Sequence, residues 1–415
     1  LTRYRLLETL RAFARERLDA DGQIDRWRRR HAAYFDAFAG LADPELFGPD
    51  QLRWARRVTT DRDNLNAALD WSLEAPDQLD ADRGLRIVIG LAAANPFGVP
   101  ALYRWIEVLL ARSRASAIPE RSVVFAIVAG WKGHVEGDYE HAERLARDGL
   151  AMAGGRDDAR TITLSYYLLG SAAYRQGRTA AALEVLSEGH ASLRAIDAPE
   201  RFHGTLHELA SLLLVIQGDI GAAADEADRA LAIARRAMNP RAVVTALASV
   251  GRSRYATDRA GALAAFEEAI ALAPSSAFDG AARSDVFDGA AQLRAEMGDR
   301  TTALGYLRAA IAYSHDTGSR VMLSMSVERA VVTLERLGED RLAALCCGIV
   351  TNQTLTPFRT LPQADRASVR VADRMGPEPF EETRAIGSAL SVRDVAPVLL
   401  ADIDTLVDDV APIDR

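Results

Sequence analysis

Lysine and cysteine are nearly absent from this 415-residue sequence, which contains Lys132 as its single lysine and the adjacent pair Cys346 and Cys347. A P-loop needs a Gly-Lys-Ser/Thr motif so that the ammonium reaches the terminal phosphates of a nucleotide. Lys132 lies instead between Trp131 and Gly133, so this sequence carries no Walker A site. Because the two cysteines are adjacent, they cannot link distant segments, and nothing in the sequence indicates an oxidising compartment. We therefore expect a cytoplasmic protein.

Long apolar runs are also missing. The longest stretch without a charge, residues 87–103, has 17 residues and contains Pro96 and Pro100. It is too short and too broken to span a bilayer. The 50 basic and 58 acidic residues give a net charge of −8, which argues against a protein that neutralises phosphates along nucleic acid. We therefore expect neither a membrane nor nucleic acid as a direct partner. Because the first residue is Leu1 and not methionine, we interpret the sequence as a fragment of a longer polypeptide.

A short turn signal recurs six times, at intervals of 39 to 41 residues. Its first positions are Gly137, Gly177, Gly218, Thr257, Gly298 and Gly338. An alanine follows each of them five residues later, at Ala142, Ala182, Ala223, Ala262, Ala303 and Ala343. Glycine at a bend supplies the left-handed backbone that ends a helix, and small residues beside it let two antiparallel helices approach closely. The pattern predicts a helical hairpin repeated six times.

One such hairpin cannot bury the apolar stripes of both its helices, so neighbouring hairpins must stack. We therefore predict an all-α fold: a superhelical solenoid of about six 40-residue helical hairpins with helical caps at both ends. The repeats would occupy residues 96–350, between caps at residues 21–95 and 351–415.

The repeat resembles the tetratricopeptide repeat, which places a small residue in the first helix, a Gly-Asp/Asn-Tyr-like turn and alanine in the second helix. Leu169-Gly170, Gly137-Asp138-Tyr139 and the alanine series match that pattern. The usual period is about 34 residues, whereas here it is close to 40. The helices or the links between them should therefore be longer than in the standard repeat.

The order of motifs along the chain resembles large actinobacterial-type regulatory ATPases, the signal-transduction ATPases with numerous domains. The matching segments are Tyr4–Leu18, Arg28–Phe35, Asp63–Trp71, Leu361–Arg366 and Phe380–Ser391. The resemblance implies that residues 1–20 end a winged-helix-like module and that a nucleotide-binding domain precedes them in the parent chain. It also implies that the helical repeats receive an inducer or a protein partner and regulate that attached ATPase, as part of a transcriptional regulator.

Candidate binding residues follow from the expected geometry of a solenoid. The first helix of each hairpin lines the concave side, so residues three, six and ten positions before each turn should point inward. The most distinctive side chains at these positions are Trp131, His134, Tyr167, Tyr174, Glu208, Arg254 and Asp288. A mixed aromatic and charged stripe suits the recognition of a peptide or a small effector. The alternative is that these are ordinary residues between helices.

His203 and His207 are four residues apart on an expected helix, a spacing that can present two imidazoles to one metal ion, and Glu208 is adjacent. The zinc-protease pattern is not met, because residue 211 is Ser and not a second histidine of such a motif. A two-ligand signal favours a structural or surface role, so we expect no metal and no cofactor. We find no catalytic constellation and expect a protein without enzymatic activity.

The leading hypothesis is a non-catalytic repeat scaffold or sensor that binds a protein partner or a small effector and regulates an attached ATPase. Two alternatives stay open. One is a metal-dependent hydrolase within a helical array, with His203, His207 and Glu208 as its site. The other is a purely structural oligomerisation arm without a ligand.

Overall fold

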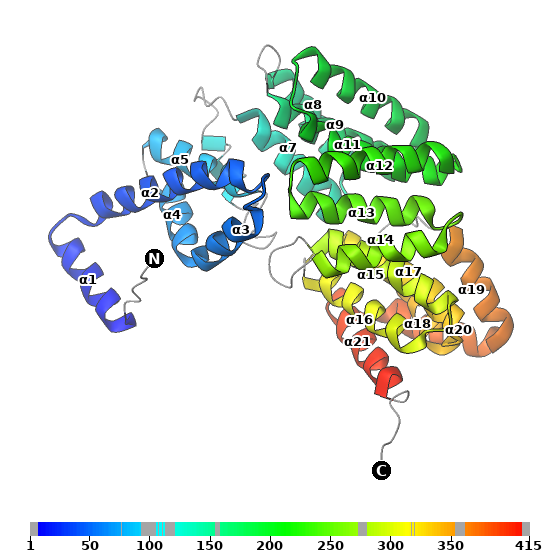
Figure 1. The fold of residues 1–415 in the computed structure, drawn as a ribbon. Helices are drawn as coiled ribbons and strands as arrows, with labels where there is room; N and C mark the ends of the chain where they lie inside the picture. The colour runs from blue at the N-terminus through cyan, green and yellow to red at the C-terminus, as the bar shows by residue number, and fades with distance from the viewer. Residues whose placement is uncertain are drawn as a thin grey trace.

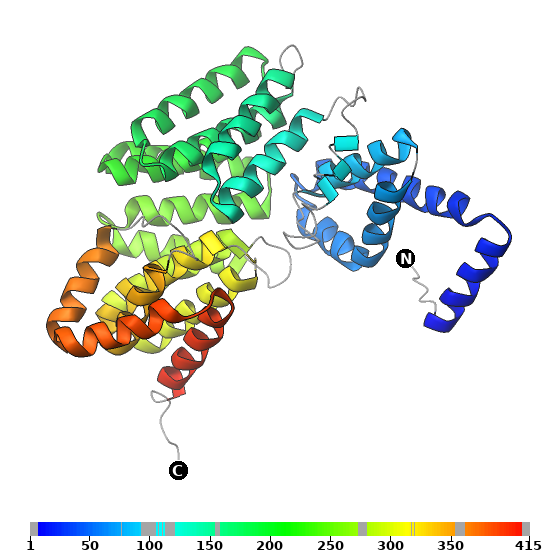
Figure 2. The same cartoon turned by 180° about the vertical axis from the view of Figure 1, so that it is seen from behind.

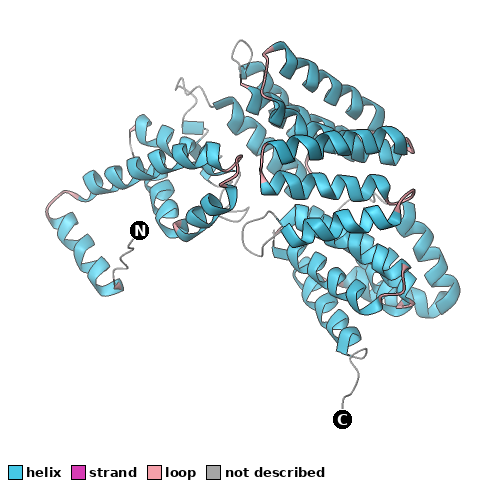
Figure 3. Cartoon of the chain, viewed as in Figure 1, coloured by secondary structure: helices cyan, strands magenta, loops and turns pink. Residues whose placement is uncertain are grey.

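The structure is a computed structural model. It describes residues 7–75, 77–92, 105–106, 108–109, 111–112, 121–153, 158–272, 280–316, 318, 320–352 and 362–408. Within these ranges every regular element is a helix and no strand occurs (Figure 3), which confirms the predicted all-α fold. None of the described helices combines the length and the apolarity needed to cross a lipid bilayer.

Ahead of the repeats lie α1 (Glu8–Ala20), α2 (Ile24–Glu45), α3 (Gln51–Thr60), α4 (Arg62–Glu74) and α5 (Gln78–Leu91), and the residues described between 105 and 112 are helical as well. Bulky side chains fill the core between them. Phe35 and Phe38 of α2 are buried together with Trp54 of α3 and Trp71 of α4. Figure 1 shows α1, in dark blue, at the end of α2 that lies away from the repeats. The first part of the expected winged-helix-like segment, residues 1–6, lies outside the described residues.

Six helical hairpins follow in the described part of the chain (Figure 1). Their helices are α7 (Arg121–Trp131), which continues as the π-helical turn η3 (Lys132–Glu136), with α8 (Tyr139–Ala153); α9 (Ala159–Arg175) with α10 (Thr179–Ala195); α11 (Gly204–Gln217), preceded by the 3-10 turn η4 (Glu200–His203), with α12 (Ile220–Arg236); α13 (Pro240–Arg254) with α14 (Arg259–Leu272); α15 (Gly280–Glu296) with α16 (Arg300–Asp316); and α17 (Arg320–Leu337) with α18 (Asp340–Val350). Every predicted bend falls between the two helices of its hairpin, which confirms the repeat.

Five of the six turns use glycine in the left-handed region of backbone space. The φ angles are 74° at Gly137, 77° at Gly177, 85° at Gly218, 78° at Gly298 and 76° at Gly338. In the third hairpin the N–H of Asp219 reaches back to the carbonyl of Leu214 at 3.0 Å, the bond that closes a helix ending in a left-handed residue. The fourth turn differs, because Thr257 does not adopt a positive φ.

Small residues let the two helices of a hairpin approach closely, as α9 and α10 do in the second hairpin. A Cβ added at Gly170 would lie 3.0 Å from Cδ2 of Leu186, and one added at Gly189 would lie 2.8 Å from Cβ of Tyr166. Contacts this short leave no room for a side chain. The small residues at these two positions are therefore required by packing.

The first helices of the six hairpins, α7, α9, α11, α13, α15 and α17, form what we call the inner ring. Each packs against the first helix of the next hairpin, so these six helices line the concave side. The ring also closes on itself, because α17 contacts η3 at the start of the array. Figures 1 and 2 show the hairpins from opposite sides, stacked from α7 to α18.

Three helices follow the last hairpin: α19 (Pro362–Met375), α20 (Pro377–Ala389) and α21 (Val392–Asp408). Helix α20 packs on α18 almost backbone to backbone, since a Cβ added at Gly387 would lie 2.1 Å from the carbonyl oxygen of Leu345. Helix α21 lies along α16, where Arg308 pairs with Asp404. These helices cover the apolar surface that the sixth hairpin would otherwise expose.

Candidate functional site

The interior of the inner ring is occupied by charged and polar side chains. At its centre, Asp285 of α15 accepts hydrogen bonds from Arg252 of α13 and from Arg329 of α17. Burial opposes ionisation of Asp285, yet the two guanidinium groups hold the pKa of its carboxyl below the usual value. Arg175 of α9 adds to this effect. Because two helices of the ring separate α9 from α15, that interaction crosses the interior.

Asp288 lies one helical turn after Asp285 and has only 1 % of its surface exposed. Its Oδ2 accepts a hydrogen bond from Ser326 Oγ at 2.9 Å and lies 3.3 Å from Arg329 Nη1. Burial raises the pKa of Asp288 to about 7, although Arg329 favours its ionised form. Its other oxygen, Oδ1, is buried and has no hydrogen-bond partner among the described residues. Arg252 Nε is likewise buried and has no hydrogen-bond partner among the described residues.

Glu208 of α11 is partly buried on the same inner face. It accepts a hydrogen bond from Thr245 Oγ1 at 2.8 Å. Burial raises the pKa of Glu208 to about 7, and the Thr245 hydroxyl and Arg252 only partly offset this. Tyr167 of α9 lies close enough for the charge of Glu208 to help raise the pKa of its phenol, after burial as the main cause. The ring therefore brings together Tyr167, Glu208 and Asp288, three of the residues predicted from sequence.

The other predicted residues are distributed differently. Tyr174 of α9 is partly buried, with the guanidinium of Arg175 5.3 Å from its ring centroid. Trp131 and His134 lie on α7 and η3, but their side chains are outside the described part of the structure. Arg254 does not reach the inner network, because it turns towards α12 and pairs with Asp228 at 2.9 Å.

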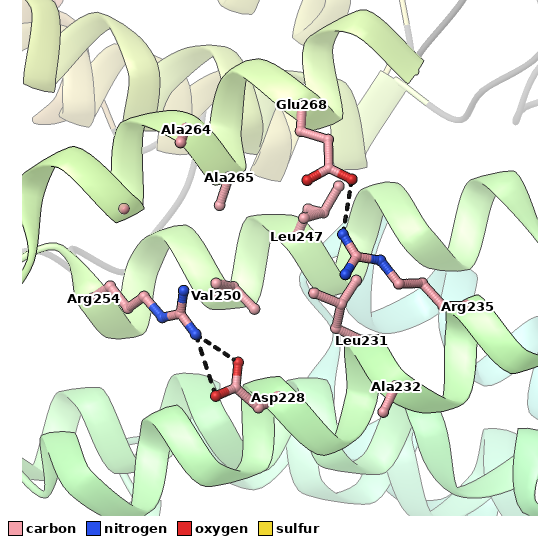
Figure 4. A pocket seen from close by; sticks show the side chains of 11 residues that line it. Asp228, Leu231, Ala232, Arg235, Leu247, Val250, Arg254, Ala264, Ala265 and Glu268 are labelled. Atoms are coloured by element: carbon pink, nitrogen blue, oxygen red, sulfur yellow. Dashed lines mark hydrogen bonds and ion pairs between the residues drawn. The ribbon is translucent and has the colours of Figure 1, made fainter.

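Arg254 lines a groove of about 420 Å³ between α12, α13 and α14 (Figure 4). Leu231, Leu247 and Val250 supply apolar lining. Two ion pairs stand at the groove: Arg254 with Asp228, and Arg235 of α12 with Glu268 of α14 at 2.8 Å. These charges satisfy one another within the chain, which distinguishes the groove from the inner face, where Asp288 and Arg252 each keep an unpaired buried atom.

The histidines of the hydrolase alternative come together, but without Glu208. His203 and His207 meet His190 of α10, with Nδ1 of His190 2.7 Å from Nδ1 of His203. His207 Nδ1 bonds to a carboxylate oxygen of Glu226 on α12. Glu208 faces Thr245 on the inner side of α11. The triad of His203, His207 and Glu208 was therefore wrong as a set.

Several charged residues of the inner ring were not predicted from the sequence. Arg175, Arg252, Asp285 and Arg329 lie two, five, thirteen and nine residues before their turns, and none of these offsets belongs to the three that we considered. A signal was available for Asp285, since it lies one helical turn ahead of the predicted Asp288 on the same face. The pairing of Arg329 with Asp285 depends on how α17 packs against α15.

The stacked hairpins, the left-handed turn glycines and the inner ring define a tetratricopeptide-like α-solenoid, with its candidate site on the concave side. No protein-family profile matches the chain. A Rap protein solved in complex with Competence and Sporulation Factor is similar over 92 % of this chain and 99 % of its own, with a TM-score of 0.56 and 12 % identity.

A second solved structure is similar over 87 % of this chain and 55 % of its own, with a TM-score of 0.50 and 13 % identity. It is a Signal Transduction ATPase with Numerous Domains protein with a tetratricopeptide repeat sensor from Pyrococcus horikoshii. At such low identity these likenesses concern the fold.

Sequence relatives match a short part of the chain. One protein of Mycobacterium bovis and two of Mycobacterium tuberculosis, each named as an HTH-type transcriptional regulator, are 42 % identical over 73 residues. That match spans 18 % of this chain and only 8 % of the length of each relative.

Proposed function

We propose that this chain is a non-catalytic sensor that binds a peptide segment of a protein partner, carrying a basic group, on the concave side of the inner ring. Binding there regulates a nucleotide-binding domain attached in the parent protein. The observation that carries the proposal is the pair of unpartnered buried atoms on the inner face, Asp288 Oδ1 and Arg252 Nε.

An unpaired buried polar atom is costly, on the order of 1–3 kcal/mol, so proteins retain such atoms where a ligand satisfies them. Asp288 Oδ1 needs a hydrogen-bond donor, and Arg252 Nε needs an acceptor. A peptide offers both along its backbone. The interior of this ring therefore matches the hydrogen-bonding pattern of an extended peptide better than that of a purely apolar ligand.

Charge favours a basic group in that peptide. Burial raises the pKa of both Glu208 and Asp288 to about 7, so each carboxyl is incompletely ionised near neutral pH. A cationic side chain placed beside them would stabilise the ionised forms. Binding of a basic peptide should then release protons.

Closure of the ring supplies a way to couple binding to regulation. In the described conformation the chain's own arginines fill the interior, and α17 contacts η3. A ligand that takes up the unpaired groups must displace part of this network, which favours a more open ring. A sensor requires such a difference in affinity between two conformations.

The comparisons support the regulatory part of the proposal. The Rap protein of similar fold was solved with Competence and Sporulation Factor, and the P. horikoshii protein is described as an ATPase with a repeat sensor. The mycobacterial relatives are named as transcriptional regulators. We accordingly propose a signal-transduction ATPase as the attached domain and transcription as the output.

The test is a binding screen with fluorescein-labelled decapeptides that each carry one arginine or lysine among neutral residues, read by fluorescence anisotropy. We expect a subset to bind the wild-type chain and Asp288→Asn to weaken them at least tenfold, because a neutral amide loses the charge complementarity. Asp228→Asn is the matched control, since it removes an acid from the outer groove, and it should change affinity less than twofold.

Two results would contradict the proposal. One is a library in which no basic peptide binds better than its neutral counterpart. The other is binding that survives Asp288→Asn but is lost in Asp228→Asn, which would move the site to the groove of Figure 4.

A further inference from the structure

Three of the seven histidines of the chain gather with one glutamate at the junction of the second and third hairpins. We call His190, His203, His207 and Glu226 the histidine cluster. The rings of His190 and His207 lie 4.3 Å apart between centroids, and those of His190 and His203 lie 5.0 Å apart. One ligand atom each from His190, His207 and Glu226 lie within 4.8 Å of one another.

We propose that the histidine cluster binds one zinc ion, with His190, His207 and Glu226 as its ligands and His203 holding the second ring nitrogen of His190. Imidazole nitrogen and carboxylate oxygen are donors that zinc accepts in tetrahedral sites. Three protein ligands leave a fourth position for water. The proposal is independent of the peptide site proposed above.

Hydrogen bonding within the cluster is the first argument. The Nδ1 atoms of His190 and His203 lie 2.7 Å apart, so one of them carries the proton that they share. When His190 donates it, the other nitrogen of His190, Nε2, presents a lone pair. That atom is buried and has no hydrogen-bond partner among the described residues. A metal ion would accept this lone pair.

The arrangement around the ligands is the second argument. Histidines that bind metal usually give their other ring nitrogen to a hydrogen-bond partner that fixes the ring. His203 has that relation to His190. Glu226 contacts His207 through one oxygen, and Arg229 donates to its other oxygen. The carboxylate is thereby held against the histidines from both sides.

Distances and access suit a metal ion. Zinc bonds of about 2.0–2.2 Å place tetrahedral ligand atoms roughly 3.3 Å apart. Small side-chain rotations suffice to reach that spacing from the present cluster, whose atoms lie within 4.8 Å. The side chains of His207 and Glu226 are 16 % and 19 % exposed, so an ion can enter from solvent.

The consequence would be a clamp between two repeats. His190 belongs to α10 and Glu226 to α12, while His207 lies between them on α11. Zinc would join the second helices of adjacent hairpins and fix their relative orientation. The cluster lies on the side of α11 away from Glu208, so the ion would act on the curvature of the array without touching the inner ring.

The experiment starts from protein stripped with a chelator and titrates it with zinc against a chromophoric chelator. We expect one zinc per chain. His190→Gln and His207→Gln should each weaken binding at least 100-fold, and His203→Ala should weaken it about 10-fold, as for a residue that orients a ligand. His141→Gln is the control, because His141 is a half-buried histidine beside Asp138, outside the histidine cluster, and its replacement should leave affinity unchanged.

Substitution of cobalt for zinc gives a second readout, since tetrahedral cobalt absorbs visible light and the histidine variants should lose that band. Circular dichroism establishes that each variant is folded, and Glu226→Gln probes the site without removing a ring. The proposal is overturned if the stripped wild-type chain takes up no zinc at 100 µM, or if folded His190→Gln and His207→Gln bind it as the wild type does.

Discussion

Arg175 on α9 donates a hydrogen bond from Nη2 to Sδ of Met325 on α17 at 2.9 Å, although 150 residues separate them in sequence. This contact joins the second hairpin to the sixth across the mouth of the inner ring. Since α17 also contacts η3 of the first hairpin, the array is wound tightly enough for its first and last hairpins to meet. How readily the ring opens should depend on contacts of this kind.

We predict that Arg175→Ala loosens the ring without unfolding it. The change removes one long-range hydrogen bond, so the free energy of unfolding should fall by about 1 kcal/mol. Hydrogen exchange should accelerate in α17 and η3 while α12 is unaffected. Arg147→Ala is the control, because Arg147 pairs with Glu143 of the same helix, α8, and with no residue of α17 or η3 among the described residues. Equal hydrogen-exchange rates in α17 and η3 of both variants would contradict a role of Arg175 in holding the ring closed.

The raised pKa of Glu208 predicts a specific pH dependence of stability. In the unfolded chain this carboxyl ionises near its ordinary pKa of 4.5, whereas in the folded chain it does so near 7. The unfolded state therefore binds fewer protons between these values, and the free energy of unfolding falls as pH rises through that window. Above pH 7 the full penalty remains.

Glu208→Gln should remove this penalty while keeping an acceptor for Thr245. Thermal denaturation should show the variant stabilised relative to wild type by on the order of 1–3 kcal/mol at pH 8 and by much less at pH 4.5. Glu268→Gln at the outer groove should show no such difference. An equal stabilisation at both pH values would contradict a raised pKa of Glu208 as its cause.

Phe266 provides a test of the close packing between α13 and α14 in the fourth hairpin. It is fully buried, and a Cβ added at Gly251 would lie 2.5 Å from its ring. Gly251→Ala should lower the free energy of unfolding by about 1–3 kcal/mol in urea titration, because the ring has nowhere to move. Gly305→Ala meets nothing within 4 Å and should instead raise it by about 0.5–1 kcal/mol. The two substitutions should therefore change the free energy of unfolding in opposite directions, and a change in the same direction would contradict this explanation.

The left-handed turns predict a contrast between the third and fourth hairpins. Gly218→Ala places a Cβ at a φ of 85° and should destabilise the chain by about 1–2 kcal/mol. Thr257→Gly should bring no gain, since that turn does not use the left-handed region. A stabilised Thr257→Gly variant, measured by thermal denaturation, would mean that the fourth turn is strained after all.

The repeat could be predicted from sequence because its signals are local. Gly218 ends a helix through its own backbone, and Ala223 meets the preceding helix because it lies one turn from the bend. The all-α fold and the six bends follow from such signals. Tyr167, Glu208 and Asp288 could be placed on the inner side by counting back from the turns, since helical periodicity fixes their direction.

Contacts between residues of different hairpins could not be predicted from the sequence in this way. Adjacent residues on a helix point about 100° apart, so His207 faces Glu226 on one side of α11 while Glu208 faces Thr245 on the other. The sequence by itself determined the hairpins and the inward direction of Tyr167, Glu208 and Asp288, but not that of Arg254, which pairs with Asp228 on α12. The tertiary structure alone decided that Arg175 meets Met325 and that His190 joins His203, because the curvature of the stack is the sum of many packing contacts between residues far apart in the chain.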